Sequence, residues 1–438
     1  MPWLLNIVYL CVLTILSPGI VWRMVRHGRY RRGLLQKLTG HLPDMAGHEL
    51  VVWFHAVSVG EVLQLQHVVA RFCDTSPHRW RILITTSTDT GYDLAVERFP
   101  DCTVSWFPLD FSWAVNRALD RVQPNLVVLT ELEFWPGFLD TCHRRKIKTA
   151  VINARMSDGS FHRYSQARWL VKPLLNHISV VTAQSTEYAE RLIALGTRPE
   201  RTAVTGSVKF DGVTTDPSNE ATVALRTLFC IDTGDVVIIA GSTQSPEEEM
   251  VLKAWKKLRC RYPHLRLILV PRHRERFDAV ASLLARDNVR CLRRSTLDEA
   301  PRKIPKDAVI LLDTIGELSA CWGLADIALV GGSFGSRGGQ NMLEPAAFGA
   351  AVLFGPNTWN FRDIVRLLLS QQAAIEVAAE NQFETHLRQL LDDEDLRTEL
   401  GLAARRIVLT QQGAIQHTVQ LLLAAFAGGD SESRRTAA

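Results

Sequence analysis

The chain has 438 residues, of which 47% are hydrophobic and 22% are charged, a composition typical of folded globular proteins rather than disordered ones. The length favours two domains of roughly 200 residues each. The formal net charge is only +4, which gives no argument for nucleic-acid binding. The eight cysteines form no CxxC pair and none has zinc-ligand spacing to a histidine, so we expect buried thiols in a reducing compartment.

The first segment of the chain has the features of a membrane anchor. Residues 2–22 contain no charged side chain, and as a helix at ~1.5 Å per residue they reach about 30 Å, enough to cross a hydrocarbon core. A signal peptide is disfavoured because the positive charge follows the apolar run rather than preceding it. A buried core helix stays possible as the alternative, because Pro18 and Gly19 weaken the segment as a membrane span. By the positive-inside rule the basic cluster after this segment stays cytosolic: Arg23, Arg26, Arg29, Arg31, Arg32 and Lys37.

From residue 50 onward, short runs rich in Val and Ile alternate with amphipathic stretches. Such continuously apolar runs are typical of strands covered on both faces, and the helical patterns between them indicate parallel, doubly wound sheets. The runs are 51–57, 81–87, 125–131, 149–154 and 179–185, then 235–242, 265–272, 308–313, 327–333 and 350–356.

The segment 210–233 contains no strong strand pattern and therefore separates two Rossmann-like lobes. We predict an α/β protein whose two lobes face a cleft. The expected parts are an anchor at 1–22, an N-terminal domain at 23–210, a C-terminal domain at 211–427 and a flexible polar tail at 428–438.

In the first lobe, polar residues follow several predicted strands, at the edge where an active site lies in this architecture. Gly60 turns the chain after strand 51–57, and the dipole of the next helix would keep the Glu61 carboxylate ionised, as a general base requires. An ordinary acidic helix start has the same appearance. Further candidates in this lobe are Ser58, Glu131, Glu133, Arg155 and Lys209.

In the second lobe the richest stretch is 331–361. Its two glycine pairs permit tight turns, and a helix expected to start near Gln340 or Asn341 would offer free N–H groups to a phosphate. Glu344 could then accept bonds from both hydroxyls of a ribose. The pattern is neither GxGxxG nor a Walker loop, and a simple glycine turn with a helix cap is the alternative. Arg272 and His273 follow another predicted strand, a position where Arg can bind phosphate bidentately. The alternative is that they form an ordinary charged first turn of a helix.

Together these segments resemble the 3-deoxy-D-manno-octulosonic acid (Kdo) transferases of lipopolysaccharide synthesis, over nearly the whole chain. The resemblance implies a GT-B glycosyltransferase that moves Kdo from CMP-Kdo to the acylated lipid A precursor (lipid IVA), with inversion and without metal or cofactor. It also implies contact with inner-membrane lipids, on the cytoplasmic face, and none with nucleic acid. The matching segments are HAVSVGE (55–61), TELEFWP (130–136), NARMS (153–157), GSVKFD (206–211), AGST (240–243), PRHRERF (271–277), GGSFGSRGGQNMLEPAAFG (331–349) and GPNTWNF (355–361).

The resemblance also implies roles for the candidate residues. Glu61 would be the general base, Arg272 and His273 would hold the CMP phosphate, and Lys209 would meet a charged group of the donor. The remaining CMP site would be lined by Gly331, Gly332, Ser333, Asn341 and Glu344, with Glu344 on the ribose. Contacts to the acceptor or the donor sugar would come from Ser58, Gly60, Glu131, Glu133 and Arg155.

Two positions depart from the family pattern. Gln340 stands where the family usually has His, and because Gln cannot titrate, a proton-donor role is lost there. Ser207 and Val208 replace the commoner Asn–Leu before Lys209, which is a packing change.

Two other functions stay open because a fold alone does not fix an activity. One is another GT-B enzyme that uses a UDP-sugar, either a lipid glycosyltransferase or a nucleotide-sugar epimerase. The other is a non-catalytic, membrane-tethered nucleotide-binding protein, which would bind CMP without turning it over.

Overall fold

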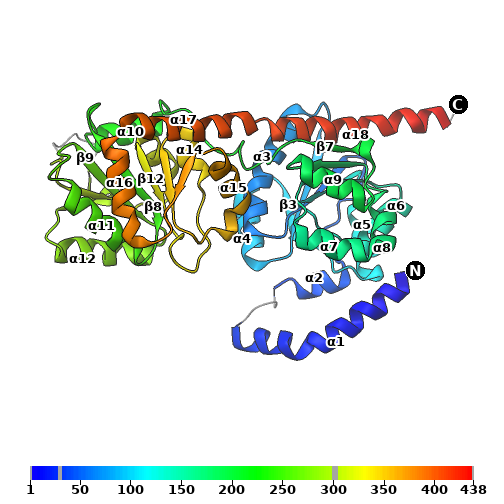
Figure 1. Ribbon diagram of the computed structural model, residues 1–438. Coiled ribbons are helices and arrows are strands. Elements are labelled where there is room, and N and C mark those ends of the chain that lie inside the picture. Colours follow the sequence, from blue (N-terminus) through cyan, green and yellow to red (C-terminus); the bar gives the residue numbers. More distant parts are fainter. Residues whose placement is uncertain (1, 28–31, 298–303, 437–438) are drawn as a thin grey trace. The chain divides into compact units, whose positions relative to one another are not determined.

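The computed structural model describes residues 2–27, 32–297 and 304–436 and consists of two compact units (Figure 1). The first unit combines Met1–Gly212 with Gln412–Ala438, and the second is Val213–Gln411. The predicted boundary between 210 and 211 lies two residues before the observed one. The prediction that 412–427 belong to the C-terminal domain is wrong, because the chain returns to the first unit at Gln412.

The first unit contains a seven-stranded parallel sheet in the order β3-β2-β1-β4-β5-β6-β7. Its strands are β1 (Leu50–His55), β2 (Trp80–Thr86), β3 (Thr103–Trp106), β4 (Leu126–Thr130), β5 (Lys148–Ala154), β6 (Val180–Ala183) and β7 (Thr202–Val204). Its helices are α1 (Pro2–His27), α2 (Leu34–Thr39), α3 (Val59–Thr75), α4 (Asp89–Arg98), α5 (Ser112–Val122), α6 (Pro136–Arg144), α7 (Asp158–Gln166), α8 (Arg168–Leu175), α9 (Thr186–Leu195) and α18 (Ala414–Thr436).

Both faces of this sheet are covered, as its continuously apolar strands predict. On β1, Trp53 packs in a core with residues of α5 and α6, whereas Phe54 points to the opposite face and packs with α3. The core on the α3 side also takes in the C-terminal helix, through a buried apolar stripe of Ala414, Ile415, Val419 and Leu422. That stripe is the physical reason why α18 belongs to the first unit.

Helix α18 begins where the chain re-enters the first unit. The Asp211 carboxylate accepts hydrogen bonds from the backbone N–H groups of Gly413 (2.7 Å) and Ile415 (2.5 Å), which fixes the start of the helix. The helix continues through Thr436, so the flexible tail predicted to begin at 428 is helical up to that residue. Residues 437 and 438 lie outside the described residues.

The second unit contains another seven-stranded parallel sheet, in the order β10-β11-β9-β8-β12-β13-β14. Its strands are β8 (Val236–Thr243), β9 (Leu265–Pro271), β10 (Cys291–Arg293), β11 (Val309–Leu311), β12 (Ile327–Val330), β13 (Ala351–Phe354) and β14 (Ala374–Glu376). Its helices are α10 (Glu220–Leu228), α11 (Glu247–Leu258), α12 (Phe277–Arg286), α13 (Leu318–Cys321), α14 (Leu343–Phe348), α15 (Arg362–Ser370), α16 (Phe383–Asp392) and α17 (Glu394–Gln411).

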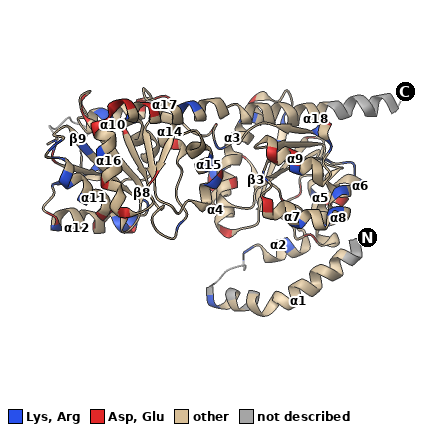
Figure 2. Ribbon diagram, in the orientation of Figure 1, with Lys and Arg blue, Asp and Glu red and all other residues tan. Residues whose placement is uncertain are grey.

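Helix α1 covers the segment expected to be an anchor and is uncharged over most of its length, with basic residues near its C-terminal end (Figure 2). Asn6 exchanges two hydrogen bonds with Ser112, and the Tyr9 hydroxyl donates to the Asp110 carboxylate at 2.8 Å. Several of its large apolar side chains are nevertheless exposed, including Ile15 at 77%. None of the helices formed by the described residues combines the length and hydropathy needed to cross a bilayer. Of the predicted basic cluster, Arg29 and Arg31 lie outside the described residues.

Candidate active site

Glu61 lies in the first turn of α3, directly beyond the carboxyl end of β1, and is only 8% exposed. Its carboxylate accepts three hydrogen bonds: Oε1 from the Ser58 hydroxyl at 2.7 Å, and Oε2 from the Val57 N–H and the Thr130 hydroxyl, both at 2.9 Å. Ser58 is the N-cap and also accepts from the Glu61 N–H. The predicted helix start and the predicted base are therefore one motif, which holds the carboxylate in a single orientation.

Thr130 was missed among the candidate residues although it lies inside the quoted segment 130–136. It is the last residue of β4, which pairs with β1 in parallel register. Its hydroxyl lies 2.8 Å from the His55 carbonyl and 2.9 Å from Glu61 Oε2, so it links the ends of both strands to the carboxylate. The adjacency of β1 and β4, which no local pattern reveals, creates this contact.

Two more acids, Glu131 and Glu133, follow Thr130 in the loop after β4. Glu131 has a left-handed backbone (φ 54°), and its N–H donates to the Ile152 carbonyl, which ties the loop to β5. Burial, and then the neighbouring charges of Glu61 and Glu131, raise the pKa of Glu133 to about 7. Acidic groups thus gather at one edge of the first sheet, as the strand-end argument predicts.

The raised pKa of Glu133 predicts a pH-dependent stability. Because the folded state favours the neutral acid, unfolding releases a proton between pH 4.5 and about 7, and the free energy of unfolding falls as pH rises through that window. The variant Glu133→Gln should remove this part of the slope in urea unfolding between pH 4.5 and about 7. Glu97→Gln, at an exposed position on α4, is the control and should keep the wild-type slope. A wild-type slope in Glu133→Gln would contradict the assignment.

His55, the last residue of β1, was also not singled out from the sequence. Its imidazole is fully buried, lies parallel to the Phe107 ring at 3.8 Å between centroids, and has Nδ1 at 3.1 Å from the Thr85 carbonyl. Burial lowers the pKa of His55 to about 3, so the ring is neutral at physiological pH. His55 is therefore a buried, neutral side chain at the end of β1 and does not act there as an acid.

The residues Arg155 and Lys209 are brought to the same edge through Asn153 of β5. The Asn153 side chain donates to Gln64 of α3 at 2.7 Å and accepts from the Val208 N–H at 3.3 Å. Its backbone is left-handed (φ 53°), and the exposed Arg155 follows β5 directly. Asn153 therefore joins α3, β5 and the segment that carries the partly exposed Lys209, and it is a further residue that sequence reasoning missed.

In the second unit, the glycine turn after β12 surrounds the side-chain carboxylate of Glu247. The backbone N–H groups of Gly332, Ser333 and Phe334 donate to the Glu247 carboxylate at 2.9, 2.9 and 3.1 Å, and Gln244 N–H adds a fourth bond at 2.9 Å. Glu247 is 1% exposed, at the start of α11. Burial raises the pKa of this carboxyl, and the four N–H groups oppose that shift.

This arrangement fixes the backbone of residues 331–333, which were expected to line the CMP site. Their backbone donors are already used, since Gly331 N–H also bonds the Gly241 carbonyl at 2.9 Å. Ser333 is fully buried, donates to the Val330 carbonyl and accepts from the Gly355 N–H. A Cβ at Gly331 would approach the Ser242 carbonyl oxygen to 2.6 Å, so glycine is required by packing. The N–H groups of these three residues are therefore used within the turn, whereas the donors for a phosphate were expected at the helix start near Gln340 and Asn341.

The second glycine pair and the helix after it carry the remaining candidates. Gly338 and Gly339 have φ of 84° and 80°, and a Cβ at Gly338 would lie 2.4 Å from the Trp359 indole. Helix α14 starts at Leu343, later than predicted, because the Asn341 side chain accepts from the Leu343 N–H at 3.1 Å and so closes a turn before the helix.

Asn341 and Glu344 form one polar group with Arg272. The Asn341 amide donates to Glu344 Oε1 at 3.0 Å. Burial raises the pKa of Glu344, while Asn341 and the positive charge of Arg272 act in the opposite direction. Arg272 and His273 are exposed and follow the carboxyl end of β9. The predicted phosphate-binding and ribose-binding residues are thus neighbours at one edge of the second sheet.

The chain is similar to known proteins over most of its length. A family model described as 3-deoxy-D-manno-octulosonic-acid transferase (kdotransferase) matches residues 26–212. The chain is 35% identical to the 3-deoxy-D-manno-octulosonic acid transferase of Haemophilus influenzae, over 94% of each chain. It is 33% identical to that of Bordetella pertussis, over 85% of this chain and 86% of the other. MurG from Acinetobacter baumannii aligns with 86% of this chain and 99% of its own, with a TM-score of 0.54 at 14% identity, a likeness of fold.

Proposed function

Since the chain belongs to the family of 3-deoxy-D-manno-octulosonic acid transferases, and is a glycosyltransferase that transfers Kdo in lipopolysaccharide synthesis, we propose that its donor is CMP-Kdo and its acceptor lipid IVA. The observation that carries the mechanism is the buried carboxylate of Glu61, held by three donors at the carboxyl end of β1. Such a fixed carboxylate can accept a proton from an acceptor hydroxyl.

On the donor side, Arg272 and His273 hold the CMP phosphate and Glu344 binds the ribose hydroxyls. Asn341 orients Glu344 through the bond at 3.0 Å, and Arg272 lies close enough to influence its charge. The guanidinium stabilises the negative charge that develops on the departing CMP, an effect that fixed positive charge can supply in place of a metal ion. In this proposal Gly331, Gly332 and Ser333 line the CMP site, and the turn around Glu247 holds them in place.

Transfer then proceeds with inversion. The acceptor hydroxyl oxygen attacks the anomeric carbon of Kdo, the bond from that carbon to the phosphate oxygen breaks, and its electron pair leaves with CMP. The hydroxyl proton passes to Glu61. Lys209 and Arg155 meet the charged groups of the donor, and Ser58, Gly60, Glu131 and Glu133 contact the sugars around the base.

The function is tested with the full chain, CMP-Kdo and lipid IVA. We expect a lipid product whose mass has grown by one or more Kdo units, and no product when a UDP-sugar replaces CMP-Kdo. Tight binding of UDP without binding of CMP would overturn the donor assignment. Binding of CMP without any product would overturn the acceptor assignment.

Helix α1 supports a place at the cytoplasmic face of the inner membrane. It presents exposed Ile7, Ile15 and Val25 and ends in basic residues, features of a helix that inserts into a lipid interface. In this proposal α1 holds the catalytic edge near a lipid acceptor, as an anchor that inserts in the membrane.

Deletion of residues 2–22 should release the chain from lipid vesicles while leaving it folded. The deletion removes the Tyr9 bond to Asp110, but that carboxylate keeps the N–H donors of Gly137 and Phe138. Co-sedimentation with anionic vesicles measures the first effect and thermal unfolding the second. A deleted chain that fails to fold would indicate instead that α1 is a core helix.

A further inference from the structure

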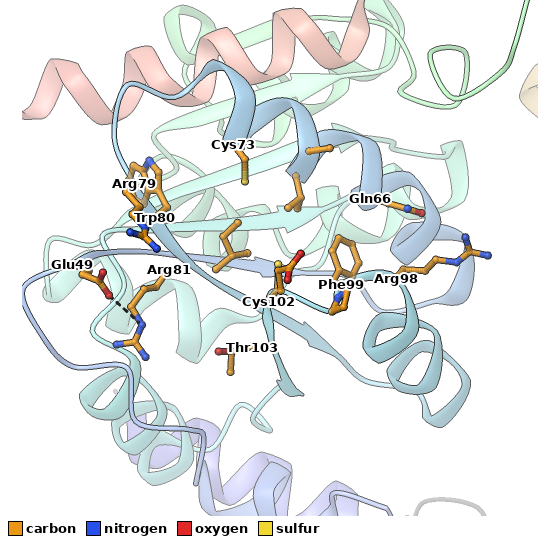
Figure 3. Close-up of a pocket in the computed structure, with 15 residues that line it drawn as sticks. Glu49, Gln66, Cys73, Arg79, Trp80, Arg81, Arg98, Phe99, Cys102 and Thr103 are labelled. Atoms are coloured by element: carbon orange, nitrogen blue, oxygen red, sulfur yellow. Dashed lines mark ion pairs between the residues drawn. The ribbon is translucent and has the colours of Figure 1, made fainter.

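A cavity of about 500 Å³ lies at the amino-terminal edge of the first sheet, away from the candidate active site (Figure 3). Its lining includes Glu49 just before β1, Trp80 at the start of β2 and Thr103 at the start of β3. Glu61 follows the carboxyl end of β1, at the opposite edge of the same sheet. The cavity is within the size range of small-molecule sites and is used by none of the residues assigned above.

The floor of this cavity is apolar. It is formed by Val69 and Ala70 of α3, by Ile82 of β2 and by Phe99 at the end of α4. Two thiols, Cys73 and Cys102, complete this surface. Burial raises the pKa of both thiols, so at neutral pH they line the cavity as uncharged, weakly polar groups.

Three arginines and two carboxylates, those of Glu49 and Asp101, also line the cavity. Arg79, which directly precedes β2, and Arg81, the second residue of β2, line one end of the cavity, and Arg98 lines the other end (Figure 3). Arg81 pairs with Glu49 at 3.6 Å and Arg98 with its neighbour Glu97 at 3.5 Å, both in exposed pairs. Within the described part of the chain Arg79 makes no ion pair.

Exposed ion pairs of this kind contribute only about 0–1 kcal/mol, so a stronger anion can replace them. Guanidinium groups bind phosphate bidentately, and two that line the same end of a cavity can share one phosphate. An apolar floor next to such a group favours a ligand with an apolar body, because burial of that body adds about 25 cal/mol per Å².

We propose that this cavity is a binding site for a small organic phosphate with an apolar or aromatic body. The phosphate is bound by Arg79 and Arg81, and the body lies over Val69, Ile82 and Phe99. This site is separate from the donor and acceptor sites, and its test does not depend on transfer activity.

The test uses Cys73 as a reporter inside the cavity and Cys260, exposed in the second unit, as the internal control. N-ethylmaleimide labelling of the full chain is followed by peptide mass, with phenyl phosphate or inorganic phosphate as the probe. Phenyl phosphate should slow labelling of Cys73 several-fold and saturably, and leave Cys260 unchanged. Inorganic phosphate should protect Cys73 much less, because it lacks a body for the apolar floor.

Three variants locate the effect. Arg79→Gln and Arg81→Gln should each weaken the protection of Cys73 by phenyl phosphate. Arg71→Gln is the matched control, because Arg71 is exposed on α3 and does not line the cavity. In this variant phenyl phosphate should protect Cys73 as it does in the wild type. The proposal is overturned if phenyl phosphate leaves Cys73 labelling unchanged, if both cavity variants protect normally, or if inorganic phosphate protects equally well.

Discussion

Glu61→Gln is expected to lower the rate of Kdo transfer by about 10²–10⁴-fold, the usual contribution of a positioned general base. The amide keeps the size of the side chain but cannot take the hydroxyl proton. Glu61→Ala should lose as much activity. Binding of CMP should stay close to the wild-type value, because Arg272, His273 and Glu344, which are proposed to hold CMP, belong to the second unit. Transfer is measured with CMP-Kdo and lipid IVA, and CMP affinity by calorimetry.

The matched control is Thr130→Val, which removes one of the three bonds to the Glu61 carboxylate and leaves the carboxylate in place. Because Thr130 positions the base without taking the proton, Thr130→Val should lose less transfer activity than Glu61→Gln. Its pH profile of kcat should keep the wild-type shape. Thermal unfolding shows whether either variant has lost its fold. Transfer at the wild-type rate in Glu61→Gln would show that another group is the base.

Glu247→Ala should have the largest effect on stability, a loss of about 3 kcal/mol or more in the free energy of unfolding. The substitution leaves four backbone N–H groups without an acceptor, among them those of Gly332 and Ser333, in a region that excludes water. The turn that they form supports the loop leading to Asn341, so CMP binding should weaken too. Urea unfolding and CMP titration measure the two effects.

Glu249→Ala is the control for this prediction because Glu249 lies on the same turn of α11 but is exposed. Its ion pair with Lys253 spans 3.9 Å at the surface, so its removal should change stability by no more than about 0.5 kcal/mol. If both variants unfold at the same urea concentration, the buried carboxylate does not stabilise the glycine turn.

The sequence predicted the inner strands of both sheets well and missed four outer ones, β3, β7, β10 and β14. All four stand at the ends of the strand orders and have only three or four residues. An edge strand has one neighbour and less cover, so it needs fewer apolar side chains and leaves a weaker pattern. Strands such as Cys291–Arg293 and Ala374–Glu376 carry too few apolar residues to be recognised from composition.

The candidate site shows the same division between local and distant information. Glu61 was found because a helix start after a strand is a local pattern. The contacts of Thr130 with Glu61, and of Gly332 with Glu247, join residues that are 69 and 85 positions apart in the chain. Only the strand order brings such groups together. No local pattern in the sequence therefore indicates that the glycine turn after β12 encloses the carboxylate of Glu247.

The return of α18 to the first unit has a consequence for the way this protein is made. Its apolar stripe covers α3, and Phe426 packs against Trp80 with 4.7 Å between ring centroids. A ribosome adds about 5–20 residues per second, so the second unit takes on the order of 10–40 s to be synthesised before α18 follows. Throughout that interval the nascent first unit exposes part of its own core. Residues that are translated after the second unit therefore complete the first unit.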